Sequence, residues 1–473
     1  MSTSQQRVAT PSSSGPDARP RTLPWLAARG AFGFAPAIEV EITQLGHDGW
    51  VAWQLDLDLV DDNALDQKLA AYPWVTMSAI DIINDPSMDT VELGHEYKGL
   101  RLLRAVESKR QLFERVCQFW EDHFNVYMGS YFRFVEDRTI WRPMALTNFP
   151  DLLRGVSTSA SMISFLNNEL NVVGAGNENL AREILELHTL GVDGPYTEAD
   201  VREFARALTG WTFDDDRLSP SFGTAIFEPS LHDFGSKTIL GTVYDQGLGQ
   251  AELGGILQML AMHPSTIDFV TGKMARFFLG DNAPPQTVEN AKVLWLQTGG
   301  DIKGIVRELL NQRAVETVAI RGGTKFRRPF DWYASIFRST GAQVPSARQN
   351  YDNMALLGQA PFEWAAPDGY PEDRERWVGL VAPRWKLAAS FARPHLGGAW
   401  NHSFWDFFGL VHGVPRAGWA RRLNQRLAGG RLSPVDVSEI QAHLDSLPAM
   451  ASNEDLLGEA LELVFASPSY QIV

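Results

Sequence analysis

Only one cysteine, Cys117, occurs among the 473 residues. A single thiol excludes an intrachain disulfide and any metal site that needs several cysteines. Because Cys117 lies within an apolar helical pattern, we expect it to pack in a core. Long apolar runs are also missing. No stretch of about 18 apolar residues occurs, so the sequence predicts no transmembrane helix and no membrane insertion.

Basic residues are in the minority, with 42 Lys and Arg against 57 Asp and Glu and a formal net charge of −15. Phosphate contacts need a basic surface, so this acidic balance argues against a nucleic-acid partner. Residues 1–23 are rich in Ser, Pro, Gln and Thr and carry neither the apolar segment of a secretory signal nor an arginine pair. We expect a disordered tail there and, for the chain as written, a cytoplasmic location.

Apolar residues recur at helical spacing along most of the remaining chain. This pattern predicts a mainly α-helical fold, a multi-helix assembly with long ordered loops and little β-structure. The longest predicted helix covers 100–124, whereas 212–242 predicts a long ordered loop or a small hairpin. Residues 358–371, rich in Pro, Gly and aromatic residues, predict another ordered loop. We expect one domain over 24–473, with a candidate subdivision near 325–345.

The stretch 177–191 concentrates polar groups on one short predicted helix flanked by glycines. At about 100° per residue, its polar side chains fall on one arc and its aliphatic side chains on the opposite one. The polar arc contains Glu178, Asn179, Arg182, Glu183 and Glu186. His188 lands among the aliphatic residues, where a core histidine is the expected role, so a regular helix offers no paired Glu and His metal ligands here.

Two interpretations of this polar arc stay open. In the first, Glu178, Arg182 and Glu186 form a solvated charge ladder of little energetic weight. In the second, the arc is a buried cluster that binds a ligand or performs acid–base chemistry. Two asparagines around Glu178 exceed what a helix N-cap requires, which favours the second interpretation.

At these residues the chain resembles a large bacterial family, domain of unknown function 1800 (DUF1800). The resemblance runs from about residue 25 to 471 and rests on several blocks in one order: 28–34, 119–124, 177–191, 196–200, 208–211, 232–241, 263–264 with Lys273, 369–371 and 467–471. It implies a largely helical fold and no settled activity. Many members are exported and encoded beside a sulfatase-like protein, which is therefore the partner that the resemblance implies. This chain lacks an obvious export signal.

Polar residues of the matched blocks supply the candidate site. The catalytic candidates are Glu183, Glu186, His232 and Lys237. The ligand-binding candidates are Asn171, Asn177, Asn179 and Arg182. The candidate ligands of a divalent metal are His123, Glu183, Glu186 and His232. His, Asn, Glu and Asp side chains suit Mg, Ca, Mn or Zn, although no spacing here is a known metal motif.

Three chemical alternatives follow from these residues: metal-assisted chemistry, metal-free acid–base chemistry on an anionic substrate held by Lys237 or Arg182, and a structural polar network. His123 ends a long predicted helix, where a capping or supporting role is expected. His232 opens a glycine-rich loop, in which Lys237 and backbone amides suit an anion. The 15 tryptophans also allow a saccharide-binding face, although Trp mostly serves burial.

The sequence thus supports an enzyme with a Glu/Asn/His polar site acting on a small or saccharide-like substrate. The alternative is a non-catalytic binding or scaffold partner of a sulfatase-like protein. We expect the polar arc to point inward and to meet His232 or Lys237. Glu183 should matter more than Glu178, because it has no basic residue one turn away and has Glu186 as a like-charged neighbour.

Overall fold

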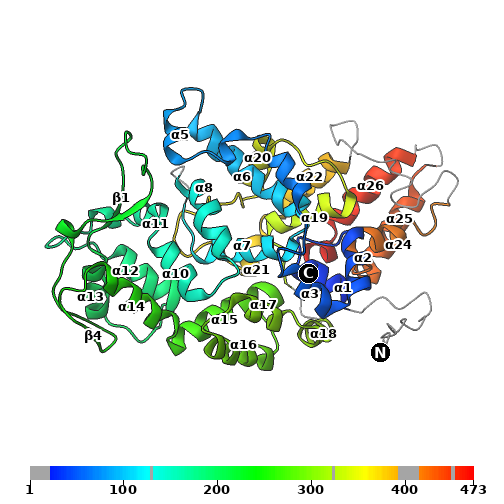
Figure 1. The fold of residues 1–473 in the computed structure, drawn as a ribbon. Coiled ribbons are helices and arrows are strands. Elements are labelled where there is room, and N and C mark those ends of the chain that lie inside the picture. Colours follow the sequence, from blue (N-terminus) through cyan, green and yellow to red (C-terminus); the bar gives the residue numbers. More distant parts are fainter. Residues whose placement is uncertain (1–21, 128–131, 322–324, 393–414, 449–452) are drawn as a thin grey trace, which may run out of the picture.

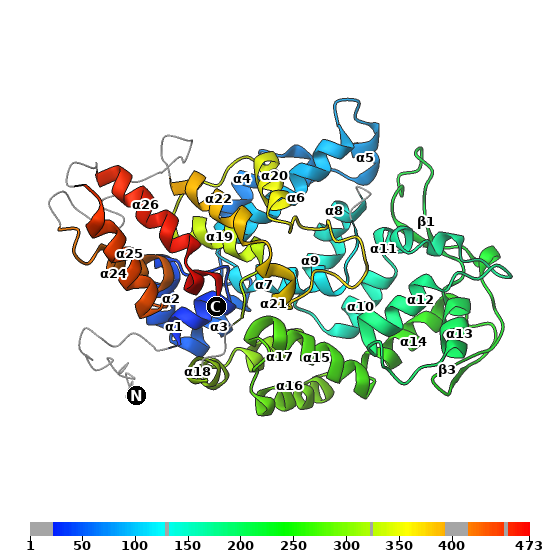
Figure 2. The same ribbon diagram turned by 180° about the vertical axis from the view of Figure 1, so that it is seen from behind.

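The computed structural model describes residues 22–127, 132–321, 325–392, 415–448 and 453–473. Helices dominate these segments, and the strands among them form two small two-stranded sheets (Figure 1 and Figure 2). The predicted mainly α-helical fold is therefore confirmed. Residues 1–21 of the predicted tail lie outside the described residues, and Leu23 already begins the first helix.

The helices before the sheets are α1 (Leu23–Arg29), α2 (Pro36–Leu45), α3 (His47–Gln54), α4 (Asn63–Leu69), α5 (Ala79–Asn84), α6 (Thr90–Glu107), α7 (Gln111–His123), α8 (Phe132–Glu136), α9 (Arg142–Met144), α10 (Phe149–Ser157), α11 (Ala160–Phe165), α12 (Asn179–Glu183) and α13 (Glu198–Leu208). Those after the sheets are α14 (Gln250–Ala261), α15 (Pro264–Leu279), α16 (Pro285–Thr298), α17 (Ile302–Leu309), α18 (Gln312–Ile320), α19 (Pro329–Thr340), α20 (Ala347–Leu356), α21 (Arg374–Val378), α22 (Val381–Ala392), α24 (Trp419–Ala428), α25 (Pro434–Ser446) and α26 (Asn453–Ala466). Short 3-10 or π-helical turns are η1 (Pro73–Val75), η2 (Asp137–Trp141), η3 (Asn168–Leu170), η4 (Ile184–Thr189), η5 (Pro229–Leu231) and η7 (Pro468–Gln471).

The turn-rich stretch 212–242 contributes to two antiparallel hairpins. Strands β1 (Trp211–Phe213) and β2 (Ala225–Phe227) pair with Trp211 opposite Phe227. Strands β3 (Lys237–Ile239) and β4 (Thr242–Tyr244) pair with Lys237 opposite Tyr244. The connection between β1 and β2 extends away from the helices (Figure 1).

The predicted continuous helix over 100–124 is wrong, because α6 and α7 are separate helices. Hydrogen bonds to the side chain of Asp62 stabilise the break between them. Its Oδ2 accepts a hydrogen bond from Ser108 Oγ at 2.6 Å, and its Oδ1 accepts one from the backbone N–H of Lys109 at 2.8 Å. A carboxylate from a distant helix start thus supplies acceptors at the join. Hydrophobic periodicity does not report such a contact.

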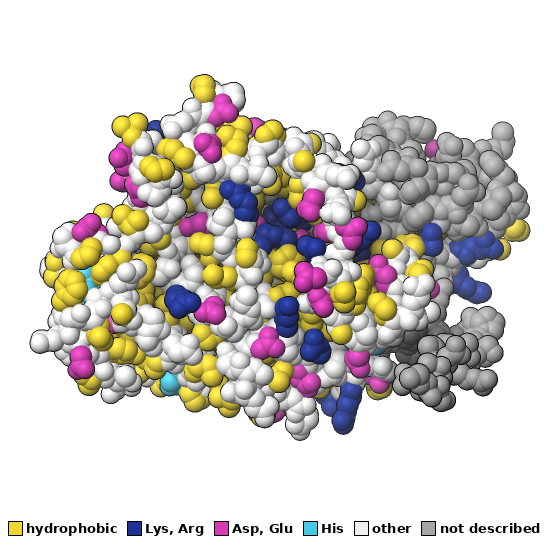
Figure 3. Space-filling model, in the orientation of Figure 1, with side chains coloured by type: hydrophobic (Ala, Val, Ile, Leu, Met, Phe, Trp, Pro, Cys, Tyr) yellow, Lys and Arg dark blue, Asp and Glu magenta, His cyan; other side chains and the backbone are white. Residues whose placement is uncertain are grey.

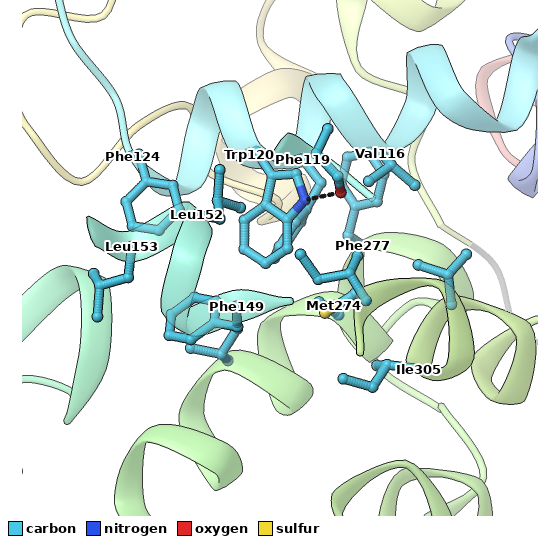
Figure 4. Packing of buried hydrophobic residues seen from close by; sticks show 14 of the residues in the cluster. Val116, Phe119, Trp120, Phe124, Phe149, Leu152, Leu153, Met274, Phe277 and Ile305 are labelled. Carbon is cyan, nitrogen blue, oxygen red and sulfur yellow. Dashed lines mark hydrogen bonds between the residues drawn. The ribbon is translucent and has the colours of Figure 1, made fainter. Parts of the chain in front are cut away.

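Two large hydrophobic clusters form the core. The larger one draws its residues from the chain between Leu23 and Val318, and Figure 4 shows Trp120 of α7 packed there beside Phe149 and Phe277. The indole N–H of Trp120 donates to the carbonyl oxygen of Ala145 at 3.0 Å, so the buried ring keeps its polar atom satisfied. The second cluster consists mostly of residues from 330 onward. The single domain with a subdivision near 325–345 stays a prediction.

The outer surface carries its charges unevenly. On the face shown in Figure 3, Lys and Arg side chains gather near the centre, while Asp and Glu side chains are scattered more widely. Within the described segments, no helix combines the length and the apolar character that crossing a membrane requires.

Candidate functional site

A cavity of about 170 Å³ lies between the end of α7, one side of α15 and the loop that precedes α21. We call it the Lys273 cavity. It is lined by Phe119, Asp122, His123, Lys273, Arg276, Phe277, Asp368, Tyr370, Pro371, Glu372 and Asp373. Both ribbon views place α21 close to α7 and α15 (Figure 1 and Figure 2). Three blocks that carry the family resemblance therefore meet here, although only His123 was among the candidate site residues.

The loop over residues 357–373 is fastened directly onto α7. Gly369 has a φ of +75°, and a Cβ placed on it would lie 1.9 Å from the backbone oxygen of Asp122. Only glycine allows this approach, because both the backbone conformation and the space exclude a side chain. Asn125 adds two hydrogen bonds, donating to the carbonyl oxygens of Trp364 at 2.8 Å and Ala366 at 2.6 Å. The predicted ordered loop is confirmed, and its glycine positions one wall of the cavity.

Lys273 is the distinctive group of this cavity. Its side chain is partly buried, and among the described residues its Nζ takes part in no hydrogen bond or ion pair; the ammonium lies 5.3 Å from the centre of the Phe269 ring. Burial lowers the pKa of Lys273 to about 8, although the carboxylates of Asp122, Asp368 and Glu372 act in the opposite direction. An amine with this pKa exists in both protonation states near neutral pH.

His123 supplies a neutral imidazole to the same cavity. The ring is buried, and its Nε2 lies 3.2 Å from the carbonyl oxygen of His188. A carbonyl oxygen only accepts, so Nε2 carries the proton and Nδ1 is left as an acceptor, which has no partner in the described structure. Burial, then Lys273 and His188, hold the pKa of His123 well below its usual range. His123 is therefore uncharged at neutral pH.

Basic side chains outside the cavity partly neutralise the carboxylates of its acidic wall. Arg328 Nη1 lies 2.6 Å from Asp122 Oδ2 and 3.1 Å from Glu372 Oε1. Burial raises the pKa of Asp122 even so, whereas for Glu372 the opposing pull of Arg328 and Lys325 outweighs burial and lowers the pKa. Asp368 accepts a hydrogen bond from the Trp364 indole at 2.7 Å. The cavity thus keeps acceptor oxygens on one wall.

His188 sits behind this site on an irregular helix. The regular helix expected over 177–191 is wrong beyond Glu183, because η4 is π-helical and Leu190 N donates to Leu185 O at 2.8 Å, five residues back. π-Helical turns are frequent at functional sites. His188 is fully buried, as expected, but neither ring nitrogen has a partner in the described structure. Burial and then Lys273 lower its pKa to about 3.

The polar arc around Arg182 is a charge ladder on a partly exposed face. Arg182 Nη2 lies 3.1 Å from Glu178 Oε2 and 2.8 Å from Glu198 Oε2, and its Nη1 lies 3.5 Å from Glu186 Oε1. Asn179 is exposed. Among the described residues no hydrogen bond or ion pair joins this arc to His232 or Lys237, so the predicted contact is not formed.

Glu183 differs from the rest of the ladder. Its pKa is raised by burial and by Glu186, against the effect of Arg182, and Asp368 raises it further. Asp368 lines the Lys273 cavity, so Glu183, the last residue of α12, lies within electrostatic range of one wall of this cavity. The catalytic roles assigned to Glu183 and Glu186 stay predictions.

His232 and Lys237 belong to a separate, fully buried cluster. Lys237 Nζ lies 2.9 Å from Glu252 Oε1 and also donates to the carbonyl oxygens of Asp233 at 2.5 Å and Gly235 at 3.0 Å. His232 Nε2 lies 3.1 Å from the same carboxylate oxygen. An ammonium has three donors, and all three are used here. This cluster joins the β3 hairpin to α14, and a catalytic role for His232 or Lys237 stays a prediction.

The amides of the ligand-binding candidates hold the backbone before α12. Asn171 Nδ2 donates to Ala205 O at 2.8 Å, and Asn171 Oδ1 accepts from the backbone N–H of Asn177 at 2.9 Å. Asn177 Oδ1 in turn accepts from the backbone N–H of Asn179 at 3.0 Å. These bonds explain two asparagines in terms of local structure. Ligand binding by Asn171, Asn177, Asn179 and Arg182 stays a prediction.

The donor set does not fit a metal site in the part of the chain that the structure describes. No group of three or more His, Cys, Asp or Glu side chains there is arranged to hold a metal ion. Of the candidate ligands, His123 faces the Lys273 cavity, whereas His232 contacts the carboxylate that Lys237 already neutralises. We therefore derive no step through a metal.

The fold and the cavity define a mainly helical protein with a lysine, a neutral imidazole and several carboxylates around one small hollow. The chain belongs to the family described as protein of unknown function (DUF1800), which it matches over residues 25–472. The family resemblance is thus confirmed over nearly the whole chain. No curated protein and no solved structure matches this chain.

Proposed function

We propose that the protein is an enzyme that performs acid–base chemistry on a small polar substrate in the Lys273 cavity. The observation that carries this proposal is Lys273, whose side chain is partly buried and borders a cavity and whose amine has no hydrogen-bond partner among the described residues. Even partial burial of a cation without a counter-ion costs stability, so such a group beside a cavity indicates a function.

Lys273 and His123 are the two groups that transfer protons in this proposal. Lys273, with a pKa of about 8, serves as a base when neutral and as an acid when protonated. His123 offers the unpartnered lone pair of Nδ1 and accepts a proton from the substrate or from Lys273. When the surroundings of two neighbouring groups push their pKa values apart, one group can act as the acid and the other as the base.

The lining favours a neutral, hydroxyl-rich substrate. Arg328 pairs with Asp122 and Glu372, and Lys325 with Glu372, but Asp368 and Asp373 form no ion pair among the described residues and add carboxylate oxygens beside Lys273 and Arg276. This excess of acceptors disfavours an anionic substrate and suits hydroxyl groups, which donate to carboxylates. The aromatic rings of Phe119 and Tyr370 complete a surface that fits a small sugar-like molecule.

A panel of compounds tests this function. Neutral aldoses and polyols, small amines and small carboxylates are each incubated with the wild type, Lys273→Met and the surface control Lys292→Met. Lys292 forms ion pairs with Asp268 and Glu289 away from the cavity, so its replacement should be silent. Melting temperature reports binding, and NMR of the compounds reports conversion.

We expect neutral hydroxylated compounds to stabilise the wild type and Lys292→Met, and at least one of them to be converted. Lys273→Met should lose both effects. Preferential binding of carboxylates, or unchanged binding and conversion in Lys273→Met, would contradict the proposal. The alternative function, a non-catalytic partner of a sulfatase-like protein, predicts that no compound is converted and that both variants still capture such a protein in a pull-down.

A further inference from the structure

We propose that Lys273 is a nucleophile, whose amine forms an imine with the aldehyde or ketone group of a neutral, hydroxylated substrate. This inference rests on the proposed function and adds the covalent step and the substrate class. It begins with the geometry of the amine. Lys273 borders the 170 Å³ cavity, and Nζ has no hydrogen-bond acceptor among the described residues that would hold its lone pair or its protons in place.

Lys325 provides an internal comparison. It also lies close to this site and also has a pKa lowered to about 8 by burial. Its Nζ, however, donates to the carbonyl oxygen of Phe277 at 2.6 Å and forms an ion pair with Glu372. Lys325 is therefore held in place as a structural cation, whereas Lys273 keeps its amine free for a ligand.

The protonation state of Lys273 supports the same role. At pH 7.4, a lysine with a pKa of about 8 is roughly one-fifth neutral, whereas an ordinary lysine with a pKa of 10.5 is neutral to less than about one part in a thousand. Only the neutral amine attacks a carbonyl carbon. Lys273 thus presents about 250 times more nucleophile than a surface lysine at this pH.

The chemical step balances without a further reactant. The amine attacks the carbonyl carbon, a C–N bond forms, and one nitrogen proton passes to the former carbonyl oxygen. The C–O bond then breaks, and the oxygen leaves as water with the second nitrogen proton. His123, which lines the same cavity and has an unpartnered Nδ1, is the group that we assign to accept and return the proton.

The carbonyl compound should carry hydroxyl groups rather than a negative charge. Asp368 and Glu372 face the cavity, and a substrate carboxylate beside them would meet like charges. Hydroxyl groups would instead donate to these oxygens. A short hydroxyaldehyde such as glycolaldehyde is therefore a suitable probe.

Reductive trapping tests the inference. Full-length protein is incubated with glycolaldehyde and sodium cyanoborohydride at pH 7.4, and the adducts are located by peptide mass spectrometry. We expect Lys273 to be modified about 100-fold faster than Lys292, with a rate that rises with pH around a midpoint near 8. Lys273→Met should lose that fast adduct and keep the slow surface modification, and circular dichroism checks its fold.

Each outcome decides the matter. Modification of Lys273 at the rate of surface lysines, or with a midpoint near 10.5, would overturn the nucleophile assignment. If Lys273 is not trapped while neutral compounds still stabilise the wild type and not Lys273→Met, the proposed function stands and only the imine step fails. If neither effect is found, both proposals fail. Fast trapping at Lys325 in place of Lys273 would show that the free amine was wrongly identified.

Discussion

Replacing Lys273 with methionine should make the protein more stable, which is unusual for a change inside a folded protein. Methionine keeps the unbranched apolar stem and removes the ammonium. In the wild type this side chain is partly buried, and its ammonium has no counter-ion within hydrogen-bond distance among the described residues. The substitution therefore removes an unfavourable charge and breaks no hydrogen bond.

The magnitude follows from the pKa of Lys273, which burial lowers from 10.5 to about 8. A lowering of this size makes the protonated lysine about 3 kcal/mol less stable in the folded protein than in the unfolded chain. The cavity admits water, which reduces this cost. We expect Lys273→Met to raise the free energy of unfolding by about 1 to 3 kcal/mol at pH 7.

The pH dependence of this gain has a definite sign. The folded pKa lies below the unfolded one, so between about pH 8 and 10.5 the unfolded chain binds more protons and the wild type gains stability as pH rises. The advantage of Lys273→Met should therefore be full below pH 8 and fall to about a quarter at pH 10.

Urea unfolding of wild type, Lys273→Met and Lys292→Met at pH 7 and pH 10 measures the effect. The surface control Lys292→Met should change the free energy of unfolding by less than about 1 kcal/mol at either pH. A loss of stability in Lys273→Met at pH 7, or a gain that does not shrink at pH 10, would refute the reasoning. Lys273 would then have a partner that the geometry does not show, and the role proposed for Lys273 at the cavity would be refuted as well.

Three further predictions concern other residues. Lys237→Met should lower the free energy of unfolding by about 3 to 5 kcal/mol, because it leaves the buried Glu252 carboxylate without its cation; a change below about 1 kcal/mol in urea unfolding would contradict this. Glu183→Gln should raise the melting temperature at neutral pH, because the pKa of Glu183 is raised in the folded protein and the wild type therefore loses stability as pH rises above 4.5. Glu178→Gln should leave the melting temperature nearly unchanged. Equal melting temperatures for the two variants would show that the polar arc is an ordinary surface. Gly369→Ala should displace the 357–373 loop, lower the melting temperature and abolish fast trapping at Lys273, because its Cβ has no space; unchanged trapping kinetics would show that the loop does not form the cavity wall.

Lys237 and Lys273 show why the sequence alone did not find the site. Lys237 and Lys273 are both single lysines within blocks that match the family, and Lys237 stood beside glycines and a histidine. In the structure Lys237 donates all its protons to fixed acceptors, whereas Lys273 has none. The sequence does not show whether the ammonium of a lysine has hydrogen-bond acceptors, because those acceptors come from distant parts of the chain. Only the folded structure distinguishes the two lysines.

Local properties were determined by the sequence itself. The spacing of apolar residues is a property of neighbouring positions, and it was sufficient for the mainly helical fold. The Pro, Gly and aromatic content of 358–371 was sufficient for an ordered loop, and the linked blocks were sufficient for the family.

Everything that depends on chain segments far apart was decided by the tertiary structure. The break between α6 and α7 needs Asp62, and the Lys273 cavity needs α7, α15 and a loop that starts about 80 residues after α15 ends. The π-helical turn at His188 likewise departs from the regular helix that its spacing predicted. Burial and electrostatic interaction depend on distance in space, and the order of residues along the chain does not specify that distance.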